Sequence, residues 1–248
     1  MTEVKGKWAL VTGANRGIGY SIAKLMASKG CNLILHSRSY DHTAEVLKEV
    51  IDMGVEAYDI SAELSDLSQV TAMMDEIEKR GKPVDIIFND AAVQIAHRAD
   101  YYTTPASDYE KSFVINTIAP MMICYRFIPK MIERGWGRVI NTTSGIRNEP
   151  EQAGYSASKA ALDKVTSDLA GKLDGTDVCI NLADPGWCRT DLGGPKAPND
   201  PDSVIPGMVV GAFIDDKKSG RLFSAQSFTG MALEEAVKKA GDLPQLFK

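Results

Sequence analysis

Tyr155 and Lys159 stand one helical turn apart and could carry out proton transfer. In an α-helix, residues four positions apart share a face, with roughly 5–6 Å between their Cβ atoms. A free tyrosine has a pKa of about 10, and a neighbouring cation favours the phenolate and lowers that pKa towards the working pH. Tyr20 and Lys24 repeat the same spacing. The elements that position each pair must therefore decide which of them, if either, does chemistry.

A glycine-rich turn follows the first apolar run of the chain and reads T-G-A-N-R-G-I-G from Thr12 to Gly19. Its G-x-x-x-G-x-G spacing is a variant of the dinucleotide-binding fingerprint. Glycine lets a phosphate approach the backbone, and the helix that follows offers free N–H groups and positive dipole at its N-terminus. The alternative is a turn that serves only strand–helix packing. We expect a dinucleotide to be bound by Gly13, Asn15, Arg16, Gly17, Ile18 and Gly19.

The end of the second expected strand indicates which dinucleotide is bound. A carboxylate there would bind the 2′-hydroxyl of NAD and repel the 2′-phosphate of NADP. Residues 35–39, Leu-His-Ser-Arg-Ser, contain no carboxylate, and Arg38 can pair with a phosphate. Arg16 could reach the same group, although either arginine could instead be a solvated surface charge. The sequence therefore predicts NADP, as NADPH in its reduced form, rather than NAD.

Short apolar runs rich in β-branched residues alternate along the chain with longer helix-like stretches. Runs that are apolar throughout, such as Leu33–Leu35, indicate strands buried on both faces, as in a parallel sheet. The alternation predicts an α/β fold, a Rossmann-type doubly wound parallel sheet flanked by helices, with ligands at the carboxyl ends of the strands. We expect strands at Trp8–Thr12, Asn32–His36, Val55–Asp59, Asp85–Asn89, Gly137–Thr143 and Val178–Ala183, and helices at Gly17–Lys29, Asp41–Met53, Leu67–Arg80, Ser107–Glu133 and Tyr155–Leu173.

Beyond Pro185 the pattern loosens. Residues 192–201 are rich in Gly and Pro and should form a loop, and a last strand is expected at 221–223. Helices are possible at 203–213 and 231–240. We expect one dinucleotide-binding oxidoreductase domain over residues 1–248, with a substrate loop at about 192–206 and an atypical C-terminal tail at 227–248.

The composition is that of an ordinary soluble globular protein of 248 residues, 44% hydrophobic and 25% charged. The net charge of −5 is spread along the chain without a dense Lys/Arg run, so neither nucleic acid nor membrane is an expected partner. We find no apolar leader and no stretch approaching the roughly 20 apolar residues of a membrane span. The four cysteines form no C-x-x-C pair and have no histidine at ligand spacing. No metal site or disulfide framework is therefore expected, and a cytoplasmic location is predicted.

The order of these motifs resembles the classical branch of the short-chain dehydrogenase/reductase family over about residues 5–195. The glycine turn is similar to the family's T-G-x-x-x-G-x-G, and Tyr155 with Lys159 to its Y-x-x-x-K. Residues 89–92, N-D-A-A, resemble its N-N-A-G segment, which steadies the sheet and borders the cofactor. Residues 63–66, E-L-S-D, resemble its adenine-binding D-[VL]-x-D, with Asp59 as an alternative register. The resemblance implies further cofactor contacts from Glu63, Leu64, Asn89, Ala91, Tyr155, Lys159, Pro185, Gly186 and Thr190.

The resemblance also implies a mechanism that interconverts a carbonyl and a secondary alcohol on a small-molecule substrate. Tyr155 would act as general acid in reduction and general base in oxidation, and Lys159 would lower its pKa and bind the nicotinamide ribose. Ser144 would hold the substrate oxygen, with Thr142 or Thr143 as alternatives. Asn116 would hold a water that links Lys159 to a proton relay. We expect the Tyr20/Lys24 pair to lie on the surface, because its helix faces no predicted cleft.

Three departures separate this chain from the family pattern. The interval from Ser144 to Tyr155 is shorter than the commonest family spacing, Asp90 and Ala92 replace the second asparagine and the glycine of N-N-A-G, and the usual V-D-G-G ending is missing. The substrate pocket is expected from Val93–Pro105, Gly145–Gly154 and Leu192–Pro206, whose side chains include Tyr101, Arg147, Glu149 and Glu151.

The resemblance implies a homo-oligomer, either a dimer or a tetramer. Two rival functions are a catalytically idle NADP-binding sensor or scaffold, and a lyase or epimerase that holds its cofactor tightly.

Overall fold

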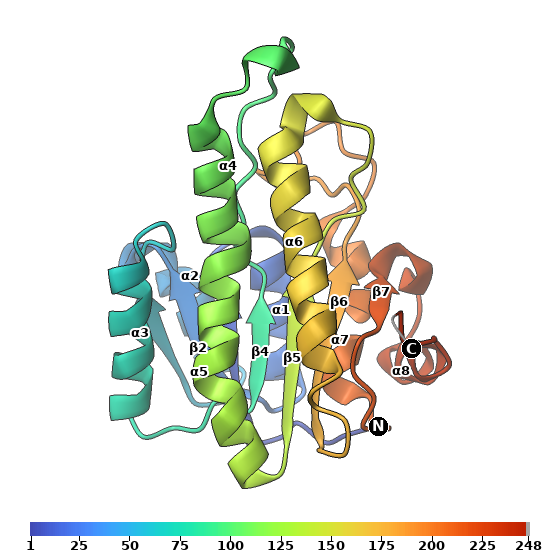
Figure 1. Cartoon of the computed structure of the whole chain (residues 1–248). Coiled ribbons are helices and arrows are strands. Elements are labelled where there is room, and N and C mark those ends of the chain that lie inside the picture. The colour runs from blue at the N-terminus through green and yellow to red at the C-terminus, as the bar shows by residue number, and fades with distance from the viewer. Residues whose placement is uncertain (247–248) are drawn as a thin grey trace.

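A seven-stranded parallel sheet forms the centre of the protein, in the order β3-β2-β1-β4-β5-β6-β7 (Figure 1). The computed structural model describes residues 1–246, so positions 247 and 248 of the predicted tail lie outside the described residues. The strand order reverses between β1 and β4, which is where open parallel sheets bind ligands. The predicted doubly wound fold is confirmed. The strands are β1 (Trp8–Thr12), β2 (Asn32–Ser37), β3 (Ala57–Ser61), β4 (Ile86–Asn89), β5 (Gly137–Thr142), β6 (Val178–Asp184) and β7 (Leu222–Ser224).

Helices cover both faces of the sheet (Figure 1). One buried hydrophobic cluster lies beneath α1, α2 and α7, with α8 packed on α7, and a second lies beneath α3, α5 and α6. The long helices in front in Figure 1 are therefore on the opposite face from α1 and α2. The helices are α1 (Gly17–Ser28), α2 (Ala44–Asp52), α3 (Leu67–Lys79), α4 (Ala106–Phe113), α5 (Ala119–Arg134), α6 (Ala153–Ala170), α7 (Ile205–Phe213) and α8 (Leu233–Gly241).

The expected helix at 107–133 is in fact three segments in succession. A π-helix at Val114–Ile118 joins α4 to α5. By length and composition this run, Ala106–Arg134, could cross a membrane, which corrects the expectation that no stretch could. However, 61% of its apolar window is buried inside the protein, as in the core helix of a soluble protein. The run is one wall of the second hydrophobic cluster.

The C-terminal third differs from the prediction in detail. The last strand, β7, pairs with β6 and confirms the strand expected near 221–223. The substrate loop ends earlier than expected, because Pro201–Val204 forms a 3₁₀ turn and α7 begins at Ile205. Of the expected tail, α8 packs its buried face, Leu233, Ala236, Val237 and Ala240, into the first hydrophobic cluster.

Candidate active site

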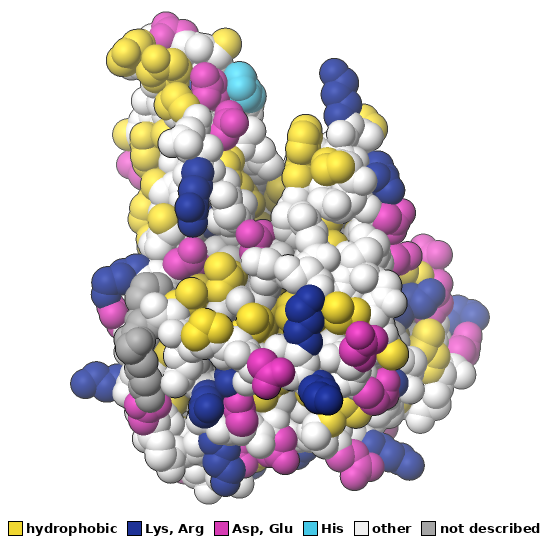
Figure 2. All heavy atoms as spheres, turned by 90° about the vertical axis from the view of Figure 1, so that its right-hand side faces the viewer, with side chains coloured by type: hydrophobic (Ala, Val, Ile, Leu, Met, Phe, Trp, Pro, Cys, Tyr) yellow, Lys and Arg dark blue, Asp and Glu magenta, His cyan; other side chains and the backbone are white. Residues whose placement is uncertain are grey.

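A cleft of about 880 Å³ opens at the edge of the sheet where β1, β4, β5 and β6 end. Figure 2 shows the molecular surface hollowed at the top between two projections. Because all the strands are parallel, their carboxyl ends deliver distant segments to this one edge. The cleft gathers these predicted site residues: Gly13, Asn15, Arg16, Gly17, Ile18, Arg38, Glu63, Leu64, Ala91, Ser144, Tyr155, Lys159, Pro185, Gly186 and Thr190.

The glycine turn packs too tightly for side chains at two of its positions. A Cβ on Gly13, which has φ +70°, would lie 3.0 Å from the Cα of Ala91, and one on Gly19 would lie 2.4 Å from the carbonyl oxygen of Gly13. Helix α1 begins after Arg16 without a side-chain cap. N–H groups of its first turn are therefore left for another acceptor, which fits the pyrophosphate of a dinucleotide.

Hydrogen bonds of the His36 side chain hold this turn against the neighbouring strands, and no sequence pattern predicted this role. Its Nδ1 accepts a hydrogen bond from the Gly13 N–H at 3.4 Å, and its Nε2–H donates to the carbonyl of Ala62 at 3.0 Å. This pattern requires the neutral ring. Burial lowers the pKa of His36 to about 4, so the ring stays neutral at working pH.

The region beyond β2 lacks a carboxylate at the expected position, and Ser37, Arg38 and His42 line the cleft there. Arg38 is exposed, as a phosphate ligand should be. The guanidinium of Arg16 forms an exposed ion pair with Asp191 from the loop after β6, which joins two walls of the cleft. Its contact with the cofactor stays a prediction.

The positions of Glu63 and Asp59 distinguish the two alternative registers of the segment expected to bind adenine. Glu63 and Leu64 line the cleft, whereas the Asp59 carboxylate accepts a hydrogen bond from the Thr43 hydroxyl at 2.9 Å. Glu63 itself accepts from the Ser65 N–H at 3.0 Å. The Glu63 register is therefore the one that faces the cleft.

Three hydroxyls follow one another at the end of β5, and their partners distinguish them. Thr142 donates to Asp90 at 2.8 Å, and Thr143 donates to Asp163. Ser144 instead lies beside the phenol of Tyr155 inside the cleft, and its hydroxyl accepts from the Ile146 N–H at 3.3 Å. Of the three hydroxyls, Ser144 is the one for which the described residues provide no carboxylate partner.

Lys159 lies one turn after Tyr155 on α6, buried to 2% exposure, and its Nζ donates to the carbonyl of Thr142 at 2.7 Å. Burial lowers its pKa to about 8, although the carboxylates of Asp90, Asp163 and Asp184 act in the opposite direction. Burial raises the pKa of Tyr155, and Asp184 and Asp90 raise it further, whereas the bond to Ser144 lowers it. The net direction is opposite to the expectation that Lys159 brings the phenol's pKa down.

Two predicted asparagines support the cleft from behind. Asn89 donates from Nδ2 to Oδ1 of Asn141 at 2.8 Å and so ties β4 to β5. Asn116, within the π-helix, donates to the Val93 carbonyl at 2.9 Å and to the Ser158 hydroxyl at 3.0 Å, and accepts from the Val93 N–H at 2.9 Å. The structure thus gives the Asn116 side chain contacts that hold the chain segment beside Ala91.

The Tyr20/Lys24 pair lies outside the cleft, as expected. The Tyr20 hydroxyl donates to Glu49 at 2.6 Å and Lys24 forms an ion pair with the same carboxylate at 3.0 Å, which joins α1 to α2. The hydrogen bond to Glu49 raises the pKa of Tyr20. This pair is a packing contact between two helices.

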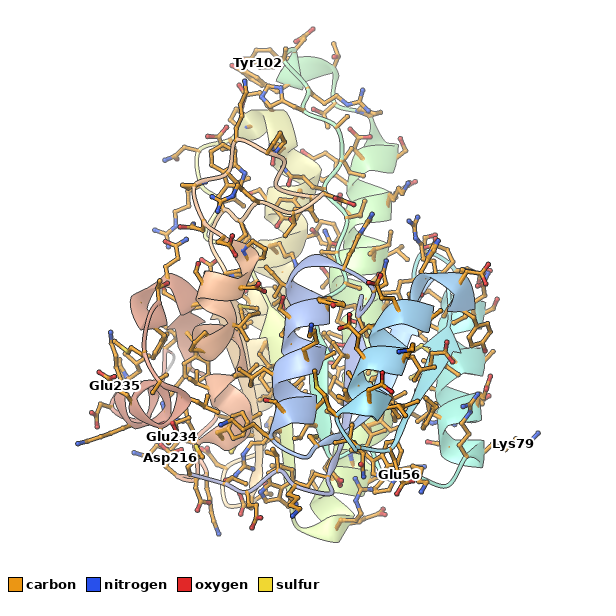
Figure 3. All side chains as sticks on the ribbon, turned by 180° about the vertical axis from the view of Figure 1, so that it is seen from behind. Glu56, Lys79, Tyr102, Asp216, Glu234 and Glu235 are labelled. Carbon is orange, nitrogen blue, oxygen red and sulfur yellow. The ribbon has the colours of Figure 1, made fainter. Side chains whose placement is uncertain are left out.

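Only the near ends of the three predicted pocket segments line the cleft, namely Val93 and Gln94, residues 145–147 with Glu149 and Gln152, and Leu192 and Gly193. Tyr101 packs instead against Tyr102 at 4.5 Å between ring centroids, and Figure 3 shows Tyr102 at the top of the molecule. Trp187 and Cys188 also border the cleft. The sequence analysis gave no role to Asp90 or Asp184, which also line it.

Comparison with known proteins agrees with this geometry. The model of the short chain dehydrogenase family matches residues 7–201. A short-chain type dehydrogenase/reductase of Picea abies is 32% identical over 196 residues, which cover 75% of this chain and 72% of that protein.

Two solved structures have the same fold. A metagenomic short-chain oxidoreductase in complex with NADP has a TM-score of 0.78 and 26% identity, covering 90% of this chain and 98% of the other. The landomycin C-6 ketoreductase LanV, with bound NADP and rabelomycin, has a TM-score of 0.79 and 26% identity, covering 94% and 98%. With a family match over residues 7–201, the chain belongs to the short-chain dehydrogenase/reductase family of oxidoreductases.

Proposed function

We propose that the protein is an NADP(H)-dependent oxidoreductase that interconverts a carbonyl and a secondary alcohol. The observation that carries the proposal is that the Ser144 hydroxyl and the Tyr155 phenol lie beside each other at the wall of the cleft that the glycine turn also lines. Two hydroxyls that face one point can together hold and polarise a substrate oxygen. A fold that only bound a dinucleotide would not need this pair.

NADP is the cofactor that the cleft favours. The glycine turn would hold the pyrophosphate at the N-terminus of α1, and Arg38, with Ser37 and His42 beside it, would hold the 2′-phosphate. The two ketoreductase and oxidoreductase structures compared above contain NADP. When bound, the cofactor supplies or accepts the hydride.

The side chains of this protein would manage the proton and the oxygen. In reduction, the carbonyl oxygen accepts hydrogen bonds from Ser144 and Tyr155, and Tyr155 gives its phenolic proton to that oxygen as negative charge develops on it. In oxidation, the Tyr155 phenolate takes the proton of the alcohol. Lys159, fixed by the carbonyl of Thr142, would bind the ribose of the cofactor.

The test is a screen for NADPH consumption over ketones and aldehydes, run with Tyr155→Phe and with Tyr20→Phe as a matched control. Loss of the proton donor should reduce kcat about 10²- to 10⁴-fold in Tyr155→Phe. Tyr20→Phe removes the same hydroxyl one turn from a lysine outside the cleft and should keep its activity. Equal activity of the two variants would refute the mechanism. Tight NADPH binding without turnover would instead indicate a sensor, and a co-purifying cofactor that is never consumed would indicate a lyase or epimerase.

We also infer a homo-oligomer, in a cytoplasmic setting. Ile118, Tyr125 and Ile132 lie seven residues apart along one face of the α5 run and are 40%, 60% and 43% exposed. Seven residues are close to two helical turns, so the three side chains form an apolar stripe. A second copy of the chain would cover it. The four cysteines are free and buried, which is consistent with a reducing compartment.

A further inference from the structure

Asp90 is fixed where three parts of the cleft meet. It directly follows β4, its N–H donates to the hydroxyl of Thr12 at 3.0 Å, and its Oδ1 accepts from the hydroxyl of Thr142 at 2.8 Å. The N–H of Gly19, in the first turn of α1, faces the same carboxylate and lowers its pKa. A Cβ on Gly19 would lie 3.1 Å from Oδ2 of Asp90. The backbone of Asp90 is therefore tied to β1, and its carboxylate is held by β5 and faces the start of α1.

Thr142 connects this carboxylate to Lys159. Its side chain donates to Asp90, and its carbonyl accepts from the Lys159 Nζ at 2.7 Å. The Lys159 ammonium and the Asp90 carboxylate are thus both hydrogen-bonded to Thr142, in a buried site. Other charged groups face this point as well: Asp163 from α6 and Asp184 from the end of β6, whereas Arg16 at the start of α1 is paired with Asp191.

We propose that Asp90 is a positioning residue that sets the pH range of the reaction, because its negative charge keeps both Tyr155 and Lys159 protonated to higher pH than an asparagine at this position would. The inference rests on the proposed function. Asparagine is the residue that the family pattern has here, so the substitution Asp90→Asn keeps the size of the side chain and an Oδ1 that can accept from Thr142, removes the charge, and puts an NH2 group in place of Oδ2. A buried carboxylate stabilises a nearby ammonium and opposes the ionisation of a nearby phenol.

The electrostatics of the site support this role. Asp90 is the leading carboxylate that raises the pKa of Lys159, and with Asp184 it raises that of Tyr155. Burial raises the pKa of Asp90 itself to about 6, against the effects of Thr142 and Lys159. The carboxylate is therefore charged above about pH 6 and loses its influence below it. Asp163 provides a contrast, because its charge raises the pKa of Lys159 but not that of Tyr155.

The experiment compares the pH dependence of kcat/KM in both directions for the wild type, Asp90→Asn and Asp163→Asn. In Asp90→Asn we expect the limbs assigned to Tyr155 and to Lys159 both to move to lower pH, by about half a pH unit or more. Asp163→Asn should move the lysine limb alone. The ratio of variant to wild-type activity should change with a midpoint near pH 6, where Asp90 loses its charge. A uniform loss of activity, with both limbs unmoved, would show a merely structural role and overturn the proposal.

A titration without turnover separates this proposal from the function on which it rests. With ¹³C-labelled tyrosine and lysine, the NMR titrations of Tyr155 and Lys159 are followed in the full chain saturated with NADP⁺ and are assigned by Tyr155→Phe and Lys159→Met. Lower pKa values for both groups in Asp90→Asn would support the inference even if no substrate is found. Unchanged values would refute it even in an active enzyme. Should Asp90→Asn fail to fold, Thr142→Val removes one hydrogen bond to the carboxylate, raises the pKa of Asp90 and should shift both titrations in the same direction.

Discussion

Gly19→Ala should damage the cofactor site by adding one methyl group. The new Cβ would lie 2.4 Å from the carbonyl oxygen of Gly13, closer than the 3.0 Å below which such contacts are essentially not seen. The atom it meets is backbone, so no side chain can rotate away. Because the two glycines belong to the same turn, the turn itself must open. On the unchanged backbone, the new Cβ would also lie 3.1 Å from Oδ2 of Asp90.

The cost follows from overpacking of a tight site, which is about 1–3 kcal/mol. For a chain of this size that lowers the Tm by about 2–4 °C per kcal/mol. If half of that energy, about 0.5–1.5 kcal/mol, is lost from cofactor binding, the affinity for NADPH falls about 2- to 13-fold, since about 1.4 kcal/mol corresponds to a factor of ten.

The assay pairs thermal unfolding with fluorescence titration of NADPH, using Gly241→Ala as the control. Gly241 ends α8, and a Cβ there meets nothing within 4 Å. Alanine is the better helix former, so the control should be unchanged or up to about 1 kcal/mol more stable. A Gly19→Ala protein that melts and binds NADPH like the wild type would refute the steric reasoning and, with it, the assignment of the turn to the pyrophosphate.

Three further predictions test other parts of the molecule. Arg38→Asp should weaken NADPH binding about 10- to 100-fold, the worth of a charge-assisted hydrogen bond, and leave NADH binding unchanged or tighter; equal losses for both cofactors would contradict the 2′-phosphate role of Arg38. The folded-state pKa of His36, about 4, lies below the ordinary value near 6.5. The neutral ring should therefore contribute about 3 kcal/mol of stability above pH 6.5, and this contribution should disappear as the pH falls to 4. Urea unfolding across this range should show that slope in the wild type and a flatter one in His36→Gln. Tyr125→Glu puts a charge into the apolar stripe of α5 and should lower the molar mass measured by light scattering, whereas the same mass for both proteins would place any interface elsewhere.

Local pattern was enough to predict the fold. The alternation of apolar runs with helical stretches fixed the parallel sheet, and β1 was predicted to the residue because Gly13 ends the run. The predicted start of β3, at Val55, is two residues too early. Val55 and Glu56 resemble strand residues in the sequence, but pairing with β2 begins only at Ala57. The π-helix around Asn116 was not predicted, because its cause is tertiary: the Asn116 side chain bonds to Val93 and Ser158, which lie 23 and 42 residues away.

Which side chains meet in the cleft was less predictable than which segments do. The sequence favoured Ser144 over Thr142 and Thr143 by resemblance alone, and the carboxylate partners of the two threonines, Asp90 and Asp163, could not be predicted from it. The ion pair of Arg16 with Asp191, 175 residues away in the chain, was not predicted. Contacts of this kind depend on how the loops after β4 and β6 fold over the sheet, which no local pattern encodes.

The two tyrosine–lysine pairs show why spacing alone cannot specify chemistry. Tyr20 and Lys24 share the carboxylate of Glu49, so a carboxylate on the neighbouring helix already accepts the phenolic hydrogen bond. Tyr155 has no such acid as its partner; its phenol meets a serine hydroxyl, and its lysine is fixed by a strand-end carbonyl. Both pairs have the same helix geometry. They differ in their surroundings, because β5 ends in front of α6 and provides the partners of Tyr155 and Lys159. It follows that moving a carboxylate next to Tyr155, as in Ser144→Asp, should convert the second pair towards the first, raise the pKa of the phenol and abolish turnover while leaving NADPH binding intact.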